Sequence, residues 1–113
     1  MDKLHPGLTI RFFTSEKCFG PGVAALLDGI RKGGSLRAAA GEMGMAYSKA
    51  WTILKTAERE LGFPLVESAA GGRSGGGSRL TKEGESLLAR YRDYCKRINA
   101  YAADLFAETF PEF

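Results

Sequence analysis

The sequence predicts a mainly α-helical domain with a small β-hairpin, and two observations favour this class. Apolar residues recur at helical spacing in several segments that are bounded by glycine or proline. Two short candidate strands flank the segment 69–77, which contains five glycines. The 113 residues fit one domain, which we place over 1–113, and 44% hydrophobic with 26% charged residues is an ordinary globular balance.

The first two predicted elements are a strand and a helix. We expect a strand over 8–13, because apolar residues alternate with other residues there after a Pro-Gly break. We expect a helix over 21–32, because Pro21 suits a first helical turn and the following apolar residues repeat at intervals of three and four. A pair of glycines ends this helix. The strand needs a partner elsewhere in the chain.

Two helices joined by a tight turn come next. Ser35 is the expected N-cap of a short, alanine-rich helix over 35–43, and Gly44 supplies the permissive backbone that the turn needs. Apolar positions at helical spacing then predict a helix over 47–61. The small side chain of Ala40 would let the two helices approach closely. This arrangement is typical of a helix-turn-helix.

A hairpin and a long helix complete the predicted fold. The hairpin is expected over 65–80, with the glycine-rich segment at its tip. Thr81 caps the last helix, which we expect over 81–109. Apolar residues along this helix are separated by alternating steps of four and three, which is a heptad seam that requires a partner. The seam consists of Leu87, Tyr91, Tyr94, Ile98, Tyr101 and Leu105.

Together these elements predict a winged helix-turn-helix with a long C-terminal dimerisation helix. In this fold the helix over 47–61 is the recognition helix and the hairpin is the wing. A helical hairpin that contains an incidental glycine is the alternative, and the wing that follows argues against it. The fold class is therefore mainly α with a small β wing.

The distribution of charge favours a nucleic-acid-binding face. The net charge is only +3 at pH 7, which by itself proves no anionic partner. Residues 31–59, however, hold six basic side chains against two acidic ones, whereas residues 98–113 hold three acidic side chains and no basic one. Such asymmetry is expected when one face of a domain binds DNA. A merely solvated helix surface is the alternative.

The candidate DNA contacts are polar and basic side chains of the motif and the wing. Hydroxyl, ammonium and guanidinium groups bond phosphates and base edges, and a thin glycine-rich wing could lay an arginine along a groove. We predict contacts from Arg37, Tyr47, Ser48, Lys49, Thr52, Lys55, Arg59, Arg73, Ser74 and Arg79. Trp51 lies one turn after Tyr47, and the two rings could pack together on the helix flank. We favour a packing role for Trp51 over contact with DNA.

Other classes of function find little support in the sequence. Cys18 and Cys95 have no metal-binding spacing, and the single histidine, His5, lies near the N-terminus. No nucleophile with a neighbouring base stands out. We therefore expect no catalytic residue, no metal and no cofactor. No segment approaches the roughly 18 apolar residues of a membrane span, and no signal peptide is present, so we expect a cytoplasmic protein without membrane contact.

Three stretches carry a resemblance to a known family. They are Tyr-Ser-Lys-Ala-Trp at 47–51, a wing that reads double glycine, Arg-Ser and triple glycine at 71–77, and Leu-Thr-Lys-Glu-Gly at 80–84. On these residues the chain resembles the N-terminal DNA-binding domain of the ModE family of molybdate-responsive regulators. It is more distantly similar to LysR-type winged helices, which share the Ser-Leu helix start, the Ala-Ala pair and the Leu-Gly before the wing.

The resemblance implies a homodimer that is held by the first and last helices. The recognition helices would occupy successive major grooves, and the wings would lie alongside. In the full-length regulators of the family a molybdate-binding domain follows, whereas this sequence ends at Phe113. We therefore expect no molybdate site within this chain.

The sequence thus favours a regulator of transcription that binds double-stranded DNA sequence-specifically as a homodimer and has no enzymatic activity. The alternative is a dimeric winged-helix adaptor that binds a protein, in which the basic face is incidental.

Overall fold

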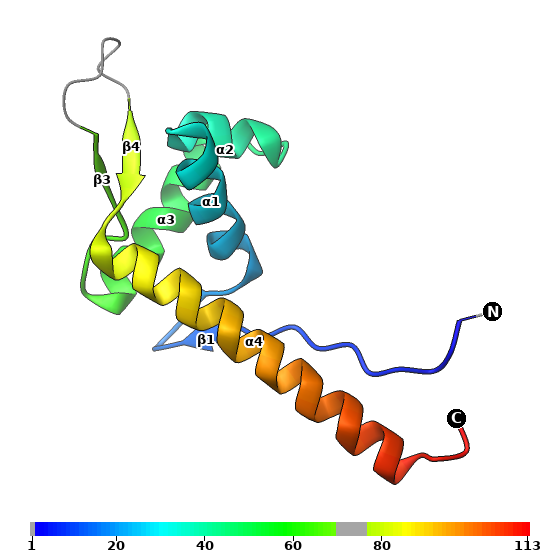
Figure 1. Cartoon of the computed structure of the whole chain (residues 1–113). Helices are drawn as coiled ribbons and strands as arrows, with labels where there is room; N and C mark the ends of the chain where they lie inside the picture. Colours follow the sequence, from blue (N-terminus) through cyan, green and yellow to red (C-terminus); the bar gives the residue numbers. More distant parts are fainter. Residues whose placement is uncertain (1, 70–76) are drawn as a thin grey trace.

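A computed structural model describes residues 2–69 and 77–113, and it confirms the predicted fold class (Figure 1). The described residues form four helices and two antiparallel two-stranded sheets. In chain order the elements are β1 (Phe12–Phe13), β2 (Lys17–Phe19), α1 (Pro21–Gly33), α2 (Leu36–Glu42), α3 (Tyr47–Leu61), β3 (Val66–Ser68), β4 (Ser78–Leu80) and α4 (Lys82–Thr109). Helices α1 to α3 pack together, hairpin β3–β4 stands beside them, and α4 extends away from them.

Helices α1 and α2 pack through small residues. Gly34 ends α1 in the left-handed conformation at φ 77°, and its N–H bonds back to the last turn at 2.8 Å. Ser35 then caps α2, because its hydroxyl oxygen accepts a hydrogen bond from the Ala38 N–H at 3.0 Å. A Cβ atom on Gly29 would lie 2.7 Å from the Cβ of Ala39. The two helices can therefore approach this closely only because residue 29 is glycine.

The turn between α2 and α3 depends on a glycine and a buried alanine. Gly44 adopts φ 65°, a conformation that strongly favours glycine. Ala40 is buried, and its carbonyl accepts a hydrogen bond from the Met45 N–H at 2.9 Å. Helix α3 then buries Ala50 and Leu54 in the core. The opposite side of α3 is consequently turned outward.

The wing is a short hairpin that is tied to the end of α1. Strands β3 and β4 pair with Val66 opposite Leu80 and Ser68 opposite Ser78. The Ser78 N–H donates a hydrogen bond to the Gly34 carbonyl at 2.7 Å. The base of the wing therefore has a fixed position beside the helix-turn-helix.

The wing leads directly into α4, and the two meet at very short range. The Thr81 hydroxyl donates to the Pro64 carbonyl at 2.8 Å and accepts from the Gly84 N–H at 2.9 Å, so it caps α4 while holding the chain before β3. A Cβ atom on Gly84 would lie only 2.2 Å from the carbonyl oxygen of Leu65. Glycine is therefore required where α4 crosses the wing base.

The strand predicted over 8–13 is wrong for most of its length. Only Phe12 and Phe13 form a strand, β1, which pairs with the unpredicted strand β2. The preceding residues lie against α4, where the Tyr91 hydroxyl donates a hydrogen bond to the Ile10 carbonyl at 2.7 Å. The alternation of apolar residues in this segment therefore reflects contact with a helix rather than with a sheet.

An aromatic cluster joins this N-terminal hairpin to α4. Tyr91 is only 3% exposed, and its ring meets those of Phe12 and Phe19 edge to face at centroid distances of 5.5 and 5.0 Å. Burial raises the pKa of the Tyr91 hydroxyl above its ordinary value. The prediction that placed Tyr91 on a dimer seam is wrong, because this ring packs in the core of its own chain.

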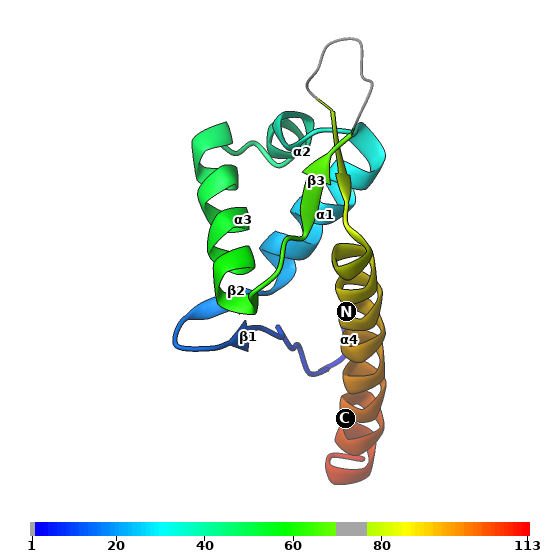
Figure 2. The ribbon, with the colours of Figure 1, turned by 90° about the vertical axis from the view of Figure 1, so that its left-hand side faces the viewer.

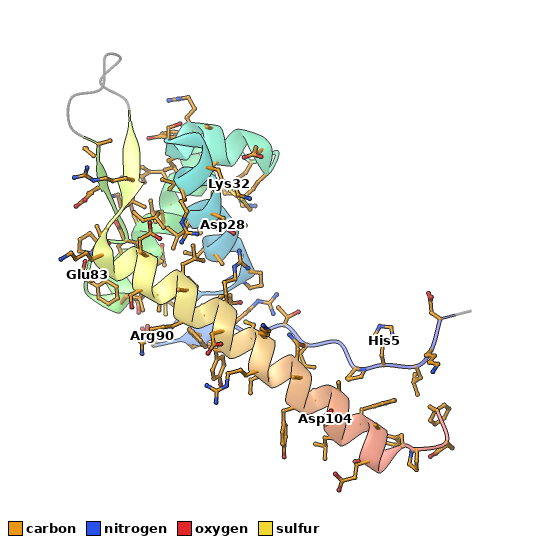
Figure 3. The ribbon with its side chains drawn as sticks, in the orientation of Figure 1. His5, Asp28, Lys32, Glu83, Arg90 and Asp104 are labelled. Carbon is orange, nitrogen blue, oxygen red and sulfur yellow. The ribbon has the colours of Figure 1, made fainter. Side chains whose placement is uncertain are left out.

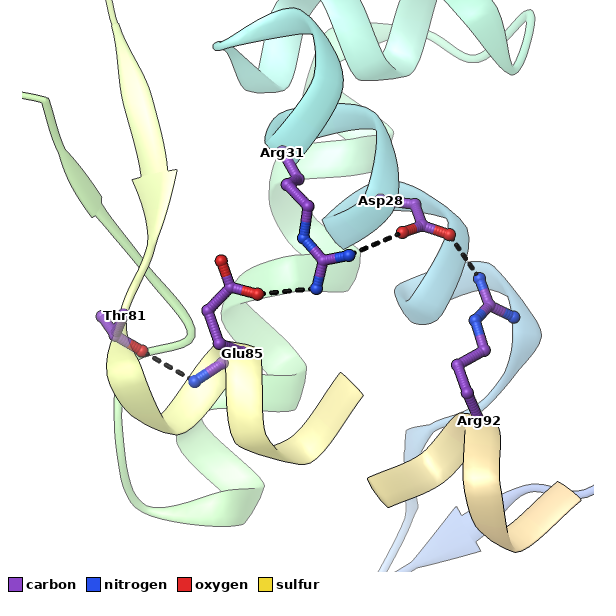
Figure 4. Close-up of polar contacts among 6 residues, drawn as sticks. Asp28, Arg31, Thr81, Glu85 and Arg92 are labelled. Carbon is purple, nitrogen blue, oxygen red and sulfur yellow. Dashed lines mark hydrogen bonds and ion pairs between the residues drawn. The ribbon is translucent and has the colours of Figure 1, made fainter. Parts of the chain in front are cut away.

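Ion pairs also link α1 to α4 (Figure 4). Asp28 on α1 pairs with Arg92 at 2.7 Å, and Arg31 on α1 pairs with Glu85 at 2.6 Å. A longer contact of 3.7 Å joins Asp28 to Arg31. Exposed pairs of this kind each contribute about 0 to 1 kcal/mol. They connect the two helices but add little to the free energy of unfolding.

Replacing Gly84 by alanine should destabilise the protein. The new methyl group would collide with backbone atoms of Leu65, which cannot rotate away as a side chain could. We expect a loss of about 1 to 3 kcal/mol or more in the free energy of unfolding, measured by urea denaturation. Gly41→Ala is the matched control, because that helical glycine has open space around it and alanine there should stabilise the protein by about 0.5 to 1 kcal/mol. Equal effects of the two substitutions would contradict the close crossing.

Candidate nucleic-acid interface

Helix α3 exposes a polar and aromatic face. Ala50, Leu54 and Ala57 form its buried side, and Figure 2 shows α1, α2 and the wing to one side of this helix. The helical repeat turns the remaining positions toward solvent. The exposed side chains are Tyr47, Ser48, Lys49, Trp51, Thr52, Lys55 and Arg59, which include every candidate contact predicted on this helix.

Two aromatic rings of α3 each lie beneath a cation. The Arg37 guanidinium, from α2, lies 4.4 Å from the ring centroid of Tyr47. The Lys55 ammonium lies 5.7 Å from that of Trp51. The spacing of Tyr47 and Trp51 would allow the two rings to pack on each other, but each ring instead contacts a cation of its own. Trp51 is 48% exposed and lies outside the core, which contradicts the packing role favoured from the sequence.

The polar centre of the face comes from one turn of α3. The Thr52 hydroxyl donates a hydrogen bond to the Ser48 carbonyl at 3.0 Å, which leaves its oxygen able to accept another. Ser48 and Lys49 are exposed beside it. Among the described side chains, no carboxylate lies within ion-pairing distance of the Lys49 ammonium. This ammonium is available to an anionic partner.

Glu58 is a structural residue of the site that the sequence analysis did not identify. One of its carboxylate oxygens accepts hydrogen bonds from the N–H groups of Leu65 and Val66 at 2.7 and 3.2 Å. The other oxygen pairs with the Lys55 ammonium at 3.2 Å. The same carboxylate therefore fixes the start of the wing to α3 and orients a candidate DNA contact.

Arg59 is held by carboxylates at the far end of α3. It pairs with Glu16 at 3.1 Å and with Glu60 at 3.3 Å. Glu60 also accepts a hydrogen bond from the Thr14 hydroxyl, and this bond is the main reason that the pKa of Glu60 lies below its ordinary value. The group anchors the β1–β2 turn to α3. The positive charge of Arg59 is largely balanced within the protein.

The wing brings one predicted contact to its outer side. Arg79 on β4 pairs across the hairpin with Glu67 on β3 at 2.8 Å, and both side chains are exposed. Arg73 and Ser74, the other predicted wing contacts, lie outside the described residues. The described part of the wing therefore contributes Arg79 alone.

Charge is separated along the molecule. Three of the six basic side chains in 31–59 are in ion pairs, which leaves Lys32, Arg37 and Lys49 without a carboxylate partner among the described residues. Figure 3 shows Lys32 at the end of α1 near α2, and Asp104 on the distal half of α4. Within residues 31–59, the basic side chains without such a partner thus lie at the end of α1 and on α2 and α3, away from the acidic end of the chain.

The predicted seam of α4 is divided between the core and the surface. Tyr91 is buried and Leu87 packs partly against the core. Four members remain on the surface or partly exposed: Tyr94, Ile98, Tyr101 and Leu105. All seam residues except Leu105 line a groove of about 690 Å³, together with Phe12, Arg90, Asp93 and Arg97. An apolar stripe of this kind on a projecting helix is unusual for a surface that faces only water.

The protein is a winged helix-turn-helix, and its α3 exposes hydroxyl and basic groups. This combination is typical of DNA-binding regulators of transcription. Residues 24–85 match the family described as bacterial regulatory helix-turn-helix protein, lysR family. The chain belongs to this family. The predictions of a LysR-like winged helix and of a regulator rather than an enzyme are confirmed.

The chain is also similar to curated molybdenum-related proteins. It is 45% identical over 67 residues to the molybdenum-pterin-binding protein MopB of Rhodobacter capsulatus, which covers 59% of this chain and 25% of that protein. It is 41% identical over 73 residues to the molybdenum transport protein ModE of Herbaspirillum seropedicae, covering 65% and 27%. With the DNA-binding transcriptional dual regulator ModE of Escherichia coli (strain K12) it shares 33% over 94 residues, covering 82% and 36%.

These matches confirm the resemblance to ModE regulators. The chain spans about a quarter to a third of the length of these relatives. Within residues 2–69 and 77–113, no helix combines the length and apolar character that a bilayer crossing requires. The same residues contain no group of three His, Cys, Asp or Glu side chains that could hold a metal ion.

Glu58→Ala should destabilise the connection between α3 and the wing. The substitution would leave the N–H groups of Leu65 and Val66 without their acceptor, and Leu65 is fully buried. We expect a loss of about 1 to 3 kcal/mol in the free energy of unfolding, measured by urea denaturation. Glu42→Ala, at an exposed glutamate of α2, should change this value much less. Similar results for the two variants would argue against the role of Glu58.

Proposed function

We propose that this chain binds double-stranded DNA sequence-specifically as a homodimer, with α3 in the major groove and the wing alongside. The exposed face of α3 is the observation that carries the proposal. Ser48, Lys49 and Thr52 present hydroxyl and ammonium groups on a helix whose other side is fixed in the core. The major groove is about 12 Å wide and admits one helix of this diameter.

The basic candidate contacts fall into two groups, those without a carboxylate partner and those paired with a glutamate. Among the described residues, Lys49 and Arg37 have no carboxylate partner, and they would meet base edges or phosphates directly. Arg59 and Arg79 are paired with glutamates and would exchange a carboxylate for a phosphate on binding, whereas Lys55 would contact DNA while it stays paired with Glu58. The remaining proposed contacts are Tyr47, Ser48, Thr52, Arg73 and Ser74. The strongest effects are therefore expected at Lys49 and Arg37.

Dimerisation would use the projecting part of α4. The apolar stripe from Tyr94 to Leu105 and the groove beside it are open in the single chain. A second copy of α4 would cover both, because a heptad seam fits a like seam. Two linked recognition helices would then read two half-sites, and each would raise the effective concentration of the other.

Lys49→Ala should weaken binding to a preferred site by about 1 to 3 kcal/mol if its ammonium bonds a base edge. The site is first selected from random duplexes, and affinity is then measured by fluorescence anisotropy. Lys96→Ala, which removes the same charge from α4, is the control and should leave affinity nearly unchanged. A loss that is equal for all duplex sequences would place Lys49 on phosphate, and no loss would remove it from the interface.

The same titrations, repeated at several salt concentrations, test DNA binding itself. The logarithm of the binding constant should fall with the logarithm of salt concentration by about 0.9 per phosphate contact. A slope near zero would instead favour the adaptor, in which the basic face has no nucleic-acid partner.

Ile98→Glu should convert the dimer to monomers, because it places a charge in the centre of the apolar stripe. Sedimentation velocity should show the monomer mass, and affinity for a two-half-site duplex should fall by about 10²-fold. Asn99→Glu adds the same charge at an exposed neighbouring position and is expected to remain dimeric. An unchanged dimer for Ile98→Glu would exclude this surface as the interface.

A further inference from the structure

Trp51 is a large apolar side chain on a polar helix face. It is the single tryptophan of the chain, and it lies in the middle of α3 outside the hydrophobic core. One exposed apolar residue needs no explanation by itself. Trp51 is set apart by its neighbours, because Ser48, Thr52 and Lys55 surround it at one-turn and adjacent positions of the same exposed surface. We therefore infer that Trp51 contacts whatever this surface of α3 binds.

The orientation of the indole is constrained by a cation. The Lys55 ammonium lies 5.7 Å from the ring centroid, and the Glu58 carboxylate in turn holds that ammonium at 3.2 Å. Glu58 is itself held by hydrogen bonds from the wing backbone. The indole is therefore connected to the wing through Lys55 and Glu58. A ring that is already oriented loses little conformational freedom when a partner packs on it.

The chemistry of the major groove limits what an indole can recognise there. The base edges offer hydrogen-bond donors and acceptors at every pair, and the 5-methyl group of thymine is the apolar group among them. Apolar side chains contact this methyl group in known recognition. We propose that Trp51 is a specificity-determining residue that reads a thymine by packing its ring on the 5-methyl group.

This proposal rests on the proposed function, because it requires α3 to lie in the major groove. Burial of a single methyl group corresponds to about a fourfold change in affinity. One thymine in each half-site should therefore be preferred over uracil, which differs from thymine only by the absence of that methyl group.

The experiment replaces each thymine of a selected duplex by uracil, one at a time, and measures affinity by anisotropy. Wild-type protein should lose about fourfold at one thymine per half-site and little at the others. Trp51→Ala should bind the thymine and uracil duplexes equally. Lys49→Ala is the matched control, because it removes a contact from the same helix and should keep the uracil effect. Circular dichroism confirms that each variant is folded.

A second readout needs no substitution. Because Trp51 is the only tryptophan, the indole emission of the wild-type protein reports this position alone, and it should change when the selected duplex binds. The proposal is overturned if emission is unchanged at saturation, if no thymine shows a uracil effect, or if Trp51→Ala retains the effect. If the wild-type protein shows no salt-dependent binding to any duplex, the proposed function itself is rejected.

Discussion

The architecture depends on the crossing of α4 over the base of the wing. Gly84 lies so close to the carbonyl of Leu65 that no side chain fits between them, and Thr81 bonds both segments at this point. The close contact lets α4 begin immediately after β4 and start in a defined direction. The ion pairs of Asp28 and Arg31 with α4 add further contacts between α1 and α4. A looser crossing would leave the projecting helix without a fixed relation to α3.

Several basic side chains of the candidate interface are already paired with glutamates of the same chain. Glutamates pair with Lys55, Arg59 and Arg79, so the basic character seen in the sequence is only partly available on the surface. Lys49 and Arg37 have no carboxylate partner among the described residues, and Arg37 is held over the Tyr47 ring. The electrostatic part of any DNA contact therefore depends on few groups, and the shape and hydroxyl chemistry of α3 assume a correspondingly larger part.

Much of the fold could be predicted, because its elements are marked locally. Proline, the Ser35 cap and glycines at positive φ bound the helices, and the predicted helices agree with α1 to α4 to within about one residue at each end. The strand over 8–13 failed because alternation cannot distinguish a sheet partner from a helix. Tyr91 was placed on the seam because heptad spacing does not show whether a ring meets its own chain or a second copy. Glu58 was missed because its partners are backbone groups of another segment.

The hydrogen bonds that hold the wing lie apart from the side chains that α3 exposes to a partner. The wing is joined to α3 through Glu58 and to α1 through the bond between Ser78 and Gly34, and neither link uses an outward-facing side chain. The separation of the two elements is thus set by backbone groups and the largely buried Glu58 carboxylate, while Ser48 and Thr52 contribute only their side chains to the surface. Under the proposed function, substitution at these positions would change the DNA sequence that is recognised without altering the spacing of α3 and the wing. In that case the recognised sequence and the spacing of the two DNA-binding elements would be set by separate groups of residues.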